Sequence, residues 1–200
     1  MKKRLPVFLI ATVLTVILTV VINSAITNFK YTNRDRVIIL AYQTNITGSD
    51  AENWQNNLKN TFSFEFEVSV YTTNSAGNES ITITTVNGWQ QVVTRLGAKQ
   101  GDILLLNQVA YETMLNNAFL LPIDFEGNNA IKADGVTYGI DISGKTAEGL
   151  TARDTSKYVG AHQPLPIYSI DDSPAIAVIY KGAKHPEMAS EVILSLWGDK

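Results

Sequence analysis

From residue 37 onward, the hydrophobic positions change repeatedly between the two spacings that distinguish strands from helices. The first run, VIILAY at residues 37–42, is nearly continuous and rich in β-branched residues, which is typical of a strand buried on both faces. The next stretch, 49–62, has Ser49 or Asp50 as the expected N-cap and apolar residues at helical spacing: Ala51, Trp54, Leu58 and Phe62. Residues 37–62 therefore predict one strand followed by one helix.

The same succession of strand and helix recurs along the rest of the chain. Further strands are expected at 64–70, 102–107, 136–142 and 174–183. Further helices are expected at 86–97, 108–119 and 185–198. The pattern loosens at 125–135 and is polar from 143 to 163. Strands that alternate with helices predict an α/β fold with a mainly parallel sheet and helices on both of its faces.

The N-terminal segment has a different pattern. After Lys2, Lys3 and Arg4, the 18 residues from Leu5 to Ile22 are strongly apolar, and as a helix they would span roughly 27 Å, close to the thickness of a bilayer core. We expect an uncleaved transmembrane anchor at 1–28, a juxtamembrane linker at 29–36 and an extracytoplasmic α/β domain at 37–200. The alternative is a cleaved signal peptide, for which the apolar run is long and the residues before Ala25 fit the cleavage pattern poorly.

The charges of the chain are unevenly distributed, and this distribution predicts the orientation of the chain in the membrane. The three N-terminal cations favour a cytoplasmic N-terminus, so the predicted topology is a single-pass protein of the cell membrane. Residues 37–200 hold ten Lys/Arg and eighteen Asp/Glu, a net charge of −8. Because phosphate neutralisation requires a concentrated basic surface, an acidic domain of this kind is not expected to bind nucleic acid.

The residue types that carry most catalytic chemistry are scarce. The chain has no cysteine and only two histidines, His162 and His185, and neither accompanies a GxSxG nucleophile motif. No group of His, Asp and Glu has metal-ligand spacing, and no phosphate-binding glycine motif is present. We therefore expect no catalytic residue, no metal and no cofactor. A pair of carboxylates acting as a hydrolase stays open, because the separation of such a pair is spatial.

Polar residues gather where the predicted strands end. In open α/β sheets, ligands bind beyond the carboxyl ends of the strands. These ends carry neutral hydrogen-bonding residues near aromatic ones, which suits a sugar, a peptide or another neutral polar ligand and equally suits ordinary turns. The candidate ligand-binding residues are Gln43, Asn45, Thr73, Asn107, Gln108 and Tyr111.

Three stretches of the chain resemble the extracellular solute-binding proteins, the substrate-capturing subunits of ABC importers. They are VIILAYQTNITGSDAENWQNNL from residue 37, GDILLLNQVAYETMLNNAFLLPID from residue 101 and PAIAVIYKGAKHPEMASEVILSLWG from residue 174. The resemblance implies one lobe of that fold, in which an Asp-led apolar strand precedes a helix and a Lys-x-Pro-Glu-x-Ala phrase begins the last helix. The domain has room for one lobe, whereas the family closes a hinged cleft between two.

These observations favour a membrane-anchored, non-catalytic module of solute-binding-protein ancestry. We expect it to act through protein interaction, as an accessory to a membrane transporter or by self-association. The second hypothesis is a receptor for a neutral polar solute, with the missing half of the cleft supplied by a homodimer. The third is the carboxylate-dependent hydrolase.

Overall fold

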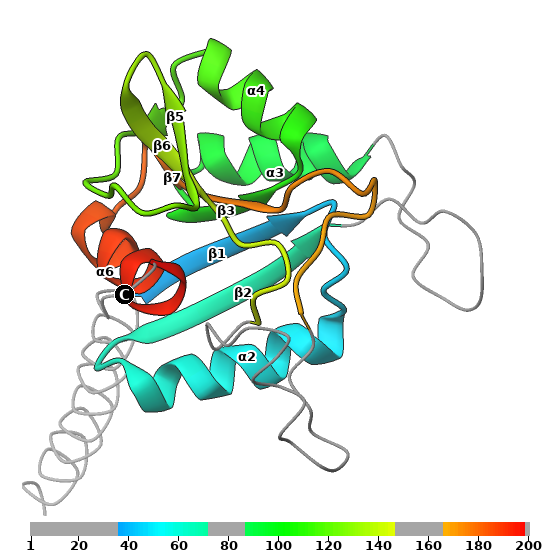
Figure 1. Cartoon of the computed structure of the whole chain (residues 1–200). Coiled ribbons are helices and arrows are strands. Elements are labelled where there is room, and N and C mark those ends of the chain that lie inside the picture. The colour runs from blue at the N-terminus through cyan, green and yellow to red at the C-terminus, as the bar shows by residue number, and fades with distance from the viewer. Residues whose placement is uncertain (1–35, 72–86, 147–165, 199–200) are drawn as a thin grey trace, which may run out of the picture. The chain divides into compact units, whose positions relative to one another are not determined.

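The computed structural model describes residues 36–71, 87–146 and 166–198 (Figure 1). The predicted anchor at 1–28, Thr73 and His162 lie outside these residues, as does all of the predicted linker except Arg36. Within the described ranges, no helix is both long enough and apolar enough to cross a membrane. The anchor, its topology and the domain boundaries therefore stay predictions.

A seven-stranded sheet forms the centre of the domain. Six strands lie in the order β2–β1–β3–β7–β6–β5. The seventh strand, β4, pairs with β7 and is not part of this order. The strands are β1 (Arg36–Tyr42), β2 (Glu65–Tyr71), β3 (Ile103–Leu106), β4 (Leu120–Leu121), β5 (Ala130–Ala133), β6 (Val136–Asp141) and β7 (Ile176–Tyr180). The helices are α2 (Gly48–Thr61), α3 (Asn87–Gly97), α4 (Gln108–Asn116) and α6 (Pro186–Trp197).

The prediction of a mainly parallel sheet is correct for one half of the sheet and wrong for the other. Strand β1 is parallel to both β2 and β3, but β7 runs antiparallel to β3, β4 and β6, and β5 is antiparallel to β6. Strand β7 is buried on both faces, so its continuous apolar run has the composition of a parallel strand. Burial determines that composition, and the composition does not record the direction of the strand.

Strand β5 was not expected, because its residues lie in the stretch where the hydrophobic pattern loosens. It forms a hairpin with β6 through Asp134 and Gly135, which have φ angles of 51° and 80°. Positive φ at two successive turn residues is typical of the tight hairpin turns that Asp-Gly favours. The Asp-Gly pair was therefore the sequence signal for this hairpin.

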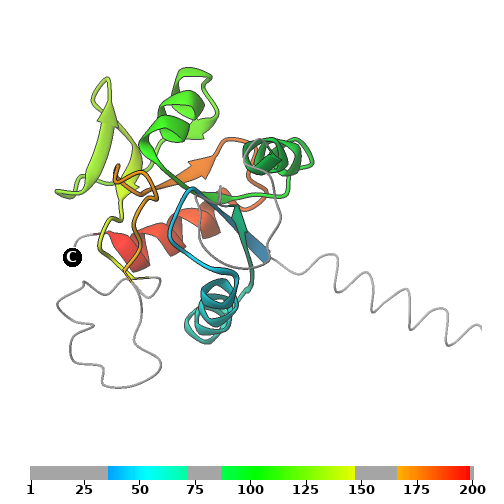
Figure 2. The same ribbon diagram turned by 90° about the vertical axis from the view of Figure 1, so that its right-hand side faces the viewer.

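Helices cover both faces of the sheet, as predicted (Figure 2). On one face, α2 and α6 pack over Ile39, Ile103 and Ala177, and on the other α3 and α4 pack over Leu40, Leu104 and Val178. Successive residues of a strand point to opposite faces, so one apolar run supplies both cores. This is why β1 and β3 contain almost no polar residue.

Helix α2 begins earlier than the sequence suggested. Its N-cap is Thr47 instead of Ser49 or Asp50, and the Thr47 hydroxyl accepts a hydrogen bond from the backbone N–H of Asp50. The Asp50 carboxylate in turn accepts from the Thr47 N–H at 2.9 Å. Such a reciprocal capping box satisfies two of the N–H groups that a helix start leaves unpaired.

Candidate functional site

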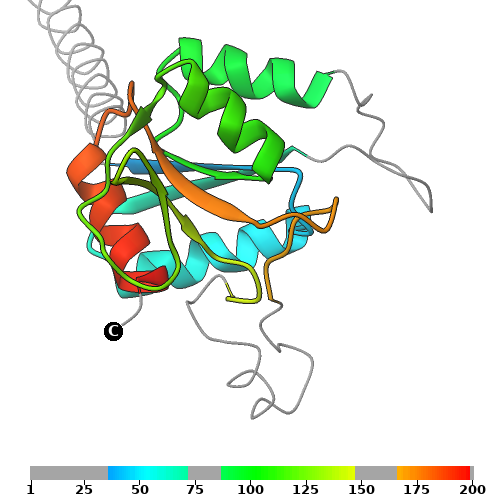
Figure 3. The ribbon, with the colours of Figure 1, turned by 45° about the horizontal axis from the view of Figure 1, so that its top comes forward.

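The carboxyl ends of β1, β2 and β3 meet at one edge of the sheet because the three strands are parallel. We call this the carboxyl edge. It is where an open α/β sheet binds ligands. In this chain the segment 166–173 lies at the carboxyl edge, and Ser169 forms an antiparallel bridge with Thr44, two residues beyond β1 (Figure 3).

Gln43 and Asn45 hold this segment in place. The carbonyl of Gln43 accepts a hydrogen bond from the N–H of Ile170 at 2.9 Å. The Asn45 side chain donates to the carbonyl of Pro166 at 2.9 Å and accepts from the N–H of Tyr168 at 2.8 Å. Both ends of the Asn45 amide are therefore engaged by the chain's own backbone.

Asn107 and Gln108 contact the same segment from the start of α4. The Asn107 Oδ1 caps α4 by accepting from the N–H of Ala110 at 3.0 Å, and its Nδ2 donates to the Asp171 carboxylate at 2.7 Å. The Gln108 backbone N–H donates to the Ser173 hydroxyl at 3.2 Å. The structure thus brings four predicted residues, Gln43, Asn45, Asn107 and Gln108, onto one segment.

Asp171 is the centre of this arrangement, although it was not among the candidate residues. One carboxylate oxygen accepts from the hydroxyl groups of Ser169 at 2.5 Å and Ser173 at 2.6 Å, and the other accepts from Asn107. We call Asn107, Ser169, Asp171 and Ser173 the strand-end cluster. Hydroxyl residues two positions before and after an Asp were the available signal, since Asx turns pair such neighbours.

The strand-end cluster stabilises a charged carboxylate. Desolvation acts to raise the pKa of Asp171, but the hydrogen bonds from Ser169, Ser173 and Asn107 outweigh it and lower the pKa from its ordinary value of 3.8 to about 2. Hydrogen bonds to the charged form of an acid have this effect. A general base works best with a pKa near the operating pH, so this carboxylate is poorly suited to activate either serine.

Tyr111 does not join the strand-end cluster. Its side chain is 3% exposed and lies against β6, where a Cβ on Gly139 would come within 3.3 Å of the ring. The hydroxyl has no hydrogen-bond partner within the described part of the chain. Burial, and then the nearby Tyr138 and Glu112, raises the pKa of Tyr111. Tyr111 is therefore part of the core between the sheet and helices α3 and α4. The remaining candidate, Thr73, lies outside the described residues.

Three apolar side chains near the strand-end cluster point to solvent. Val109 follows Gln108 in the first turn of α4 and is 66% exposed, while Tyr168 and Ile170 are 46% and 41% exposed. From residue 167 to residue 170 the orientation alternates: Ile167 and Ser169 are buried, whereas Tyr168 and Ile170 are exposed. We call Val109, Tyr168 and Ile170 the apolar rim.

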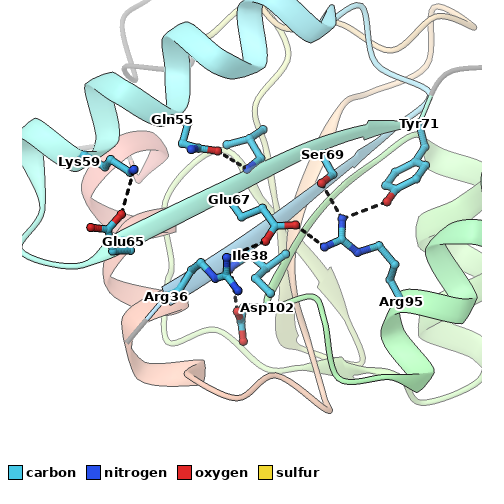
Figure 4. A network of polar contacts seen from close by, with 11 residues as sticks. Arg36, Ile38, Gln55, Lys59, Glu65, Glu67, Ser69, Tyr71, Arg95 and Asp102 are labelled. Atoms are coloured by element: carbon cyan, nitrogen blue, oxygen red, sulfur yellow. Dashed lines mark hydrogen bonds and ion pairs between the residues drawn. The ribbon is translucent and has the colours of Figure 1, made fainter. Parts of the chain in front are cut away.

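A second polar network lies on the face of β2 that α3 covers (Figure 4). Arg95 of α3 donates to the Ser69 hydroxyl at 2.6 Å and to the Tyr71 hydroxyl at 3.2 Å, and it forms an ion pair with Glu67. Burial acts to lower the pKa of Arg95, but the bonds to Glu67 and Tyr71 outweigh it and raise that pKa. The network joins α3 to β2, because Arg95 binds three side chains of β2.

The described residues contain no group of three or more His, Cys, Asp and Glu that could hold a metal ion. His185 lies at the start of α6, where its side chain makes no capping hydrogen bond. The polar groups gathered at the carboxyl edge are thus amides, hydroxyls and one stabilised carboxylate. Their hydrogen bonds hold segment 166–173 against the ends of β1 and β3.

No protein-family model matches the sequence, and no curated protein matches it. Among solved structures, the iron-bound HitA from Pseudomonas aeruginosa is 9% identical with a TM-score of 0.46, and the match covers 80% of each chain. The PBP AgtB from A. tumefacien R10, in complex with agropinic acid, is 10% identical with a TM-score of 0.42, and the match covers 78% of this chain and 76% of that one. Both neighbours are periplasmic solute-binding proteins, the class that the sequence motifs resemble. At these identities the likeness concerns the fold alone, and no argument about ligand or partner follows from it.

Proposed function

We propose that the chain is a membrane-anchored, extracytoplasmic and non-catalytic module that acts through protein interaction at the apolar rim, as an accessory to a membrane transporter. One observation carries the proposal: the side chains of Asn45 and Asn107, which a solute would be expected to use, are engaged by segment 166–173. The carboxyl edge is therefore closed by the chain itself. Besides the carboxylates of Asp171 and Asp172, it presents the apolar side chains of Tyr168 and Ile170 to solvent.

A neutral polar solute would have to compete with the segment for these amides. Exchanging one set of hydrogen bonds for another yields little net free energy, about 1 kcal/mol for each additional bond. The solute would also have to displace Asp171, whose carboxylate accepts from three side chains. These two costs argue against solute binding at the carboxyl edge while segment 166–173 occupies it.

The composition of the apolar rim supports a protein partner. Interface centres are enriched in aromatic and apolar side chains and depleted in charge, with polar groups around them. Tyr168 and Ile170 have this character, and the strand-end cluster fixes the backbone that presents them. A rigid backbone reduces the conformational entropy that is lost on binding.

The anchor and the topology are part of the same proposal. A helix at 1–28 with the domain outside the cell would confine the apolar rim to the layer next to the membrane. Tethering raises the effective concentration of the domain for partners in the same bilayer, so a modest interface is sufficient. A transporter subunit is such a partner.

Site-specific photo-cross-linking in intact membranes tests the interaction. A photoreactive residue at Ile170 or Tyr168 is compared with one at Val136 or Phe119, which are equally exposed at 41% and 47% but lie elsewhere on the domain. We expect adducts with a membrane protein from the first pair only. Equal labelling by both pairs, or adducts from the second pair alone, would contradict the proposal.

A thermal-shift screen separates this function from solute capture. The full chain in detergent is melted with pooled sugars, short peptides and amino acids. A ligand that binds only the folded state stabilises it by about 2.7 kcal/mol at a hundredfold excess over its dissociation constant. We expect no saturable shift. A saturable shift that Asn107→Ala abolishes would instead favour the receptor, and ligand-dependent dimers would favour its homodimeric form.

A further inference from the structure

Strand β2 is the last strand at one end of the sheet, and the outer edge of this strand has no neighbouring strand among the described residues. Its backbone groups alternate in direction. The Tyr71 carbonyl accepts from the N–H of Gln43, so it faces β1. Because alternate residues of a strand direct their backbone groups to opposite sides, those of Phe66, Val68 and Val70 face outward.

One of these outward groups is covered by a side chain from α2. The Gln55 Oε1 accepts the N–H of Val68 at 3.2 Å in a half-buried position (Figure 4). One helical turn further along, Lys59 pairs with Glu65 of β2 at 2.9 Å. Residues four apart share a helix face, so α2 directs one polar row along the outer edge of β2.

The charges of β2 do not protect this edge in the usual way. Exposed edges are commonly protected by charged side chains, prolines or bulges. Here Glu65 is paired with Lys59, and Glu67 is paired with both Arg36 and Arg95. The seven residues EFEVSVY contain no proline and are otherwise rich in strand-forming side chains. With its charges paired, the strand is suited to adding another strand.

The sequence of β2 also fits a second copy of itself. In an antiparallel pair centred on Val68, Glu67 faces Ser69, Phe66 faces Val70 and Glu65 faces Tyr71. No like charges are directly opposite, which is the arrangement that cross-strand pairs favour. The central pair would exchange hydrogen bonds between the two Val68 residues. The Val68 N–H required for this is the group that Gln55 covers.

We propose that Gln55 closes the outer edge of β2 to strand pairing, and that the strand it excludes is β2 of a second copy of this chain.

The test is the oligomeric state of the full-length chain in detergent, measured by sedimentation over a range of protein concentrations. Gln55→Leu keeps the size of the side chain and removes the acceptor, whereas Gln55→Glu keeps an acceptor. Asn56→Ala is the matched control, because Asn56 is the next residue of α2 and is exposed. We expect Gln55→Leu to self-associate about tenfold more tightly or more, and the other three proteins, wild type included, to remain alike.

Two further measurements identify the surface. Proline at position 68 removes the outward N–H, and edge strands tolerate proline at such positions, so Gln55→Leu with Val68→Pro should return to the wild-type state. The Val68 amide of Gln55→Leu should exchange its hydrogen slowly at high concentration and fast at low concentration. If Gln55→Leu folds poorly, Gln55→Asn takes its place, since its shorter side chain does not reach the edge.

The proposal fails if the variant that lacks the Gln55 acceptor melts cooperatively and associates no more than wild type. It also fails if the association persists with Val68→Pro, because the copies would then meet elsewhere. Equal association of Asn56→Ala would show that any change in α2 has this effect and would overturn the role of Gln55.

Discussion

The carboxylate of Asp102 accepts a hydrogen bond from the backbone N–H of Ile38 at 2.9 Å, across 64 residues of sequence (Figure 4). Its other oxygen accepts from the N–H groups of Lys184 and His185 at 2.8 and 3.2 Å. Asp102 is 2% exposed and immediately precedes β3. One buried carboxylate therefore joins all three stretches by which the sequence resembles solute-binding proteins, and it does so at the sheet edge opposite the carboxyl edge.

Removing this carboxylate should destabilise the whole domain. Asp102→Ala leaves three backbone N–H groups without their acceptor, and each such loss at a buried site costs about 1–3 kcal/mol. We expect a loss of roughly 3–5 kcal/mol in the free energy of unfolding. Asp102→Asn should lose less, because one oxygen can still accept. Urea unfolding followed by tryptophan fluorescence measures both variants.

The control for Asp102 is Asp134→Asn. Asp134 lies in the exposed turn before β6 with a φ of 51°, a conformation that Asn also tolerates. This variant removes a carboxylate without unpairing any N–H group of the core, so its unfolding should match that of wild type. Equal stability of Asp102→Ala and wild type would contradict the joining role of Asp102.

The strand-end cluster should make stability depend on acid pH. The pKa of Asp171 is lowered in the folded state to about 2 from an ordinary value of 3.8. The stabilisation from its charged form is therefore complete above about pH 5 and is lost as the pH falls from 4 toward 2. Wild type should melt above Asp171→Asn at neutral pH, and the difference should shrink over this range.

The neighbouring Asp172→Asn provides the comparison for this pH profile. Asp172 is exposed, has a φ of 60° that Asn accepts and is not a member of the strand-end cluster. Its melting temperature should follow that of wild type at each pH. A constant difference between wild type and Asp171→Asn from pH 7 to pH 2 would show that the hydrogen bonds to Asp171 do not stabilise its charge.

The sequence was sufficient for the longer elements and their burial, because apolar spacing is a local property. The apolar runs of β1, β3 and β7 and the helical stripes of α2 and α6 identified the layers. The antiparallel direction of β7 was not available, since buried strands of either direction have the same composition. Strand β5 was missed because its hairpin depends on the two turn residues Asp134 and Gly135, and its own four residues form too weak a pattern.

Four of the candidate residues lie together at the carboxyl edge, but the sequence did not reveal their hydrogen-bond partners. Gln43, Asn45, Asn107 and Gln108 were chosen as candidates because they follow strands, which is a positional rule. Their hydrogen-bond partners in segment 166–173 include Pro166, Tyr168, Ile170, Asp171 and Ser173, which lie between 64 and 127 residues later in the chain. Asn and Thr at strand ends have the same pattern whether a solute or another part of the chain satisfies them. The burial of Tyr111 could not be read from the sequence either, since helical spacing gives the face of a residue but not the depth of its hydroxyl.

A charge exchange between Asn107 and Asp171 tests their pairing. Asp is as good an N-cap as Asn, so Asn107→Asp preserves the cap of α4 but places a second carboxylate opposite Asp171. We expect a loss of about 1–2 kcal/mol in the free energy of unfolding at pH 7. Adding Asp171→Asn restores a donor opposite an acceptor, so the double variant should recover most of the loss. A double-mutant cycle gives the coupling, and additive effects would show that the two residues do not interact.

The hydroxyl of Tyr111 offers the clearest distinction between a binding residue and a core residue. It is buried without a hydrogen-bond partner among the described residues, so Tyr111→Phe removes an unsatisfied group and should leave stability unchanged or raise it by up to about 1 kcal/mol. The matched variant Tyr71→Phe removes a hydroxyl that accepts from Arg95 and should lose about 0.5–1.5 kcal/mol. Thermal melting of both variants decides the matter. If Tyr111→Phe were the less stable of the two, the Tyr111 hydroxyl would have a partner in the folded protein, and the interpretation of Tyr111 as a core residue alone would be wrong.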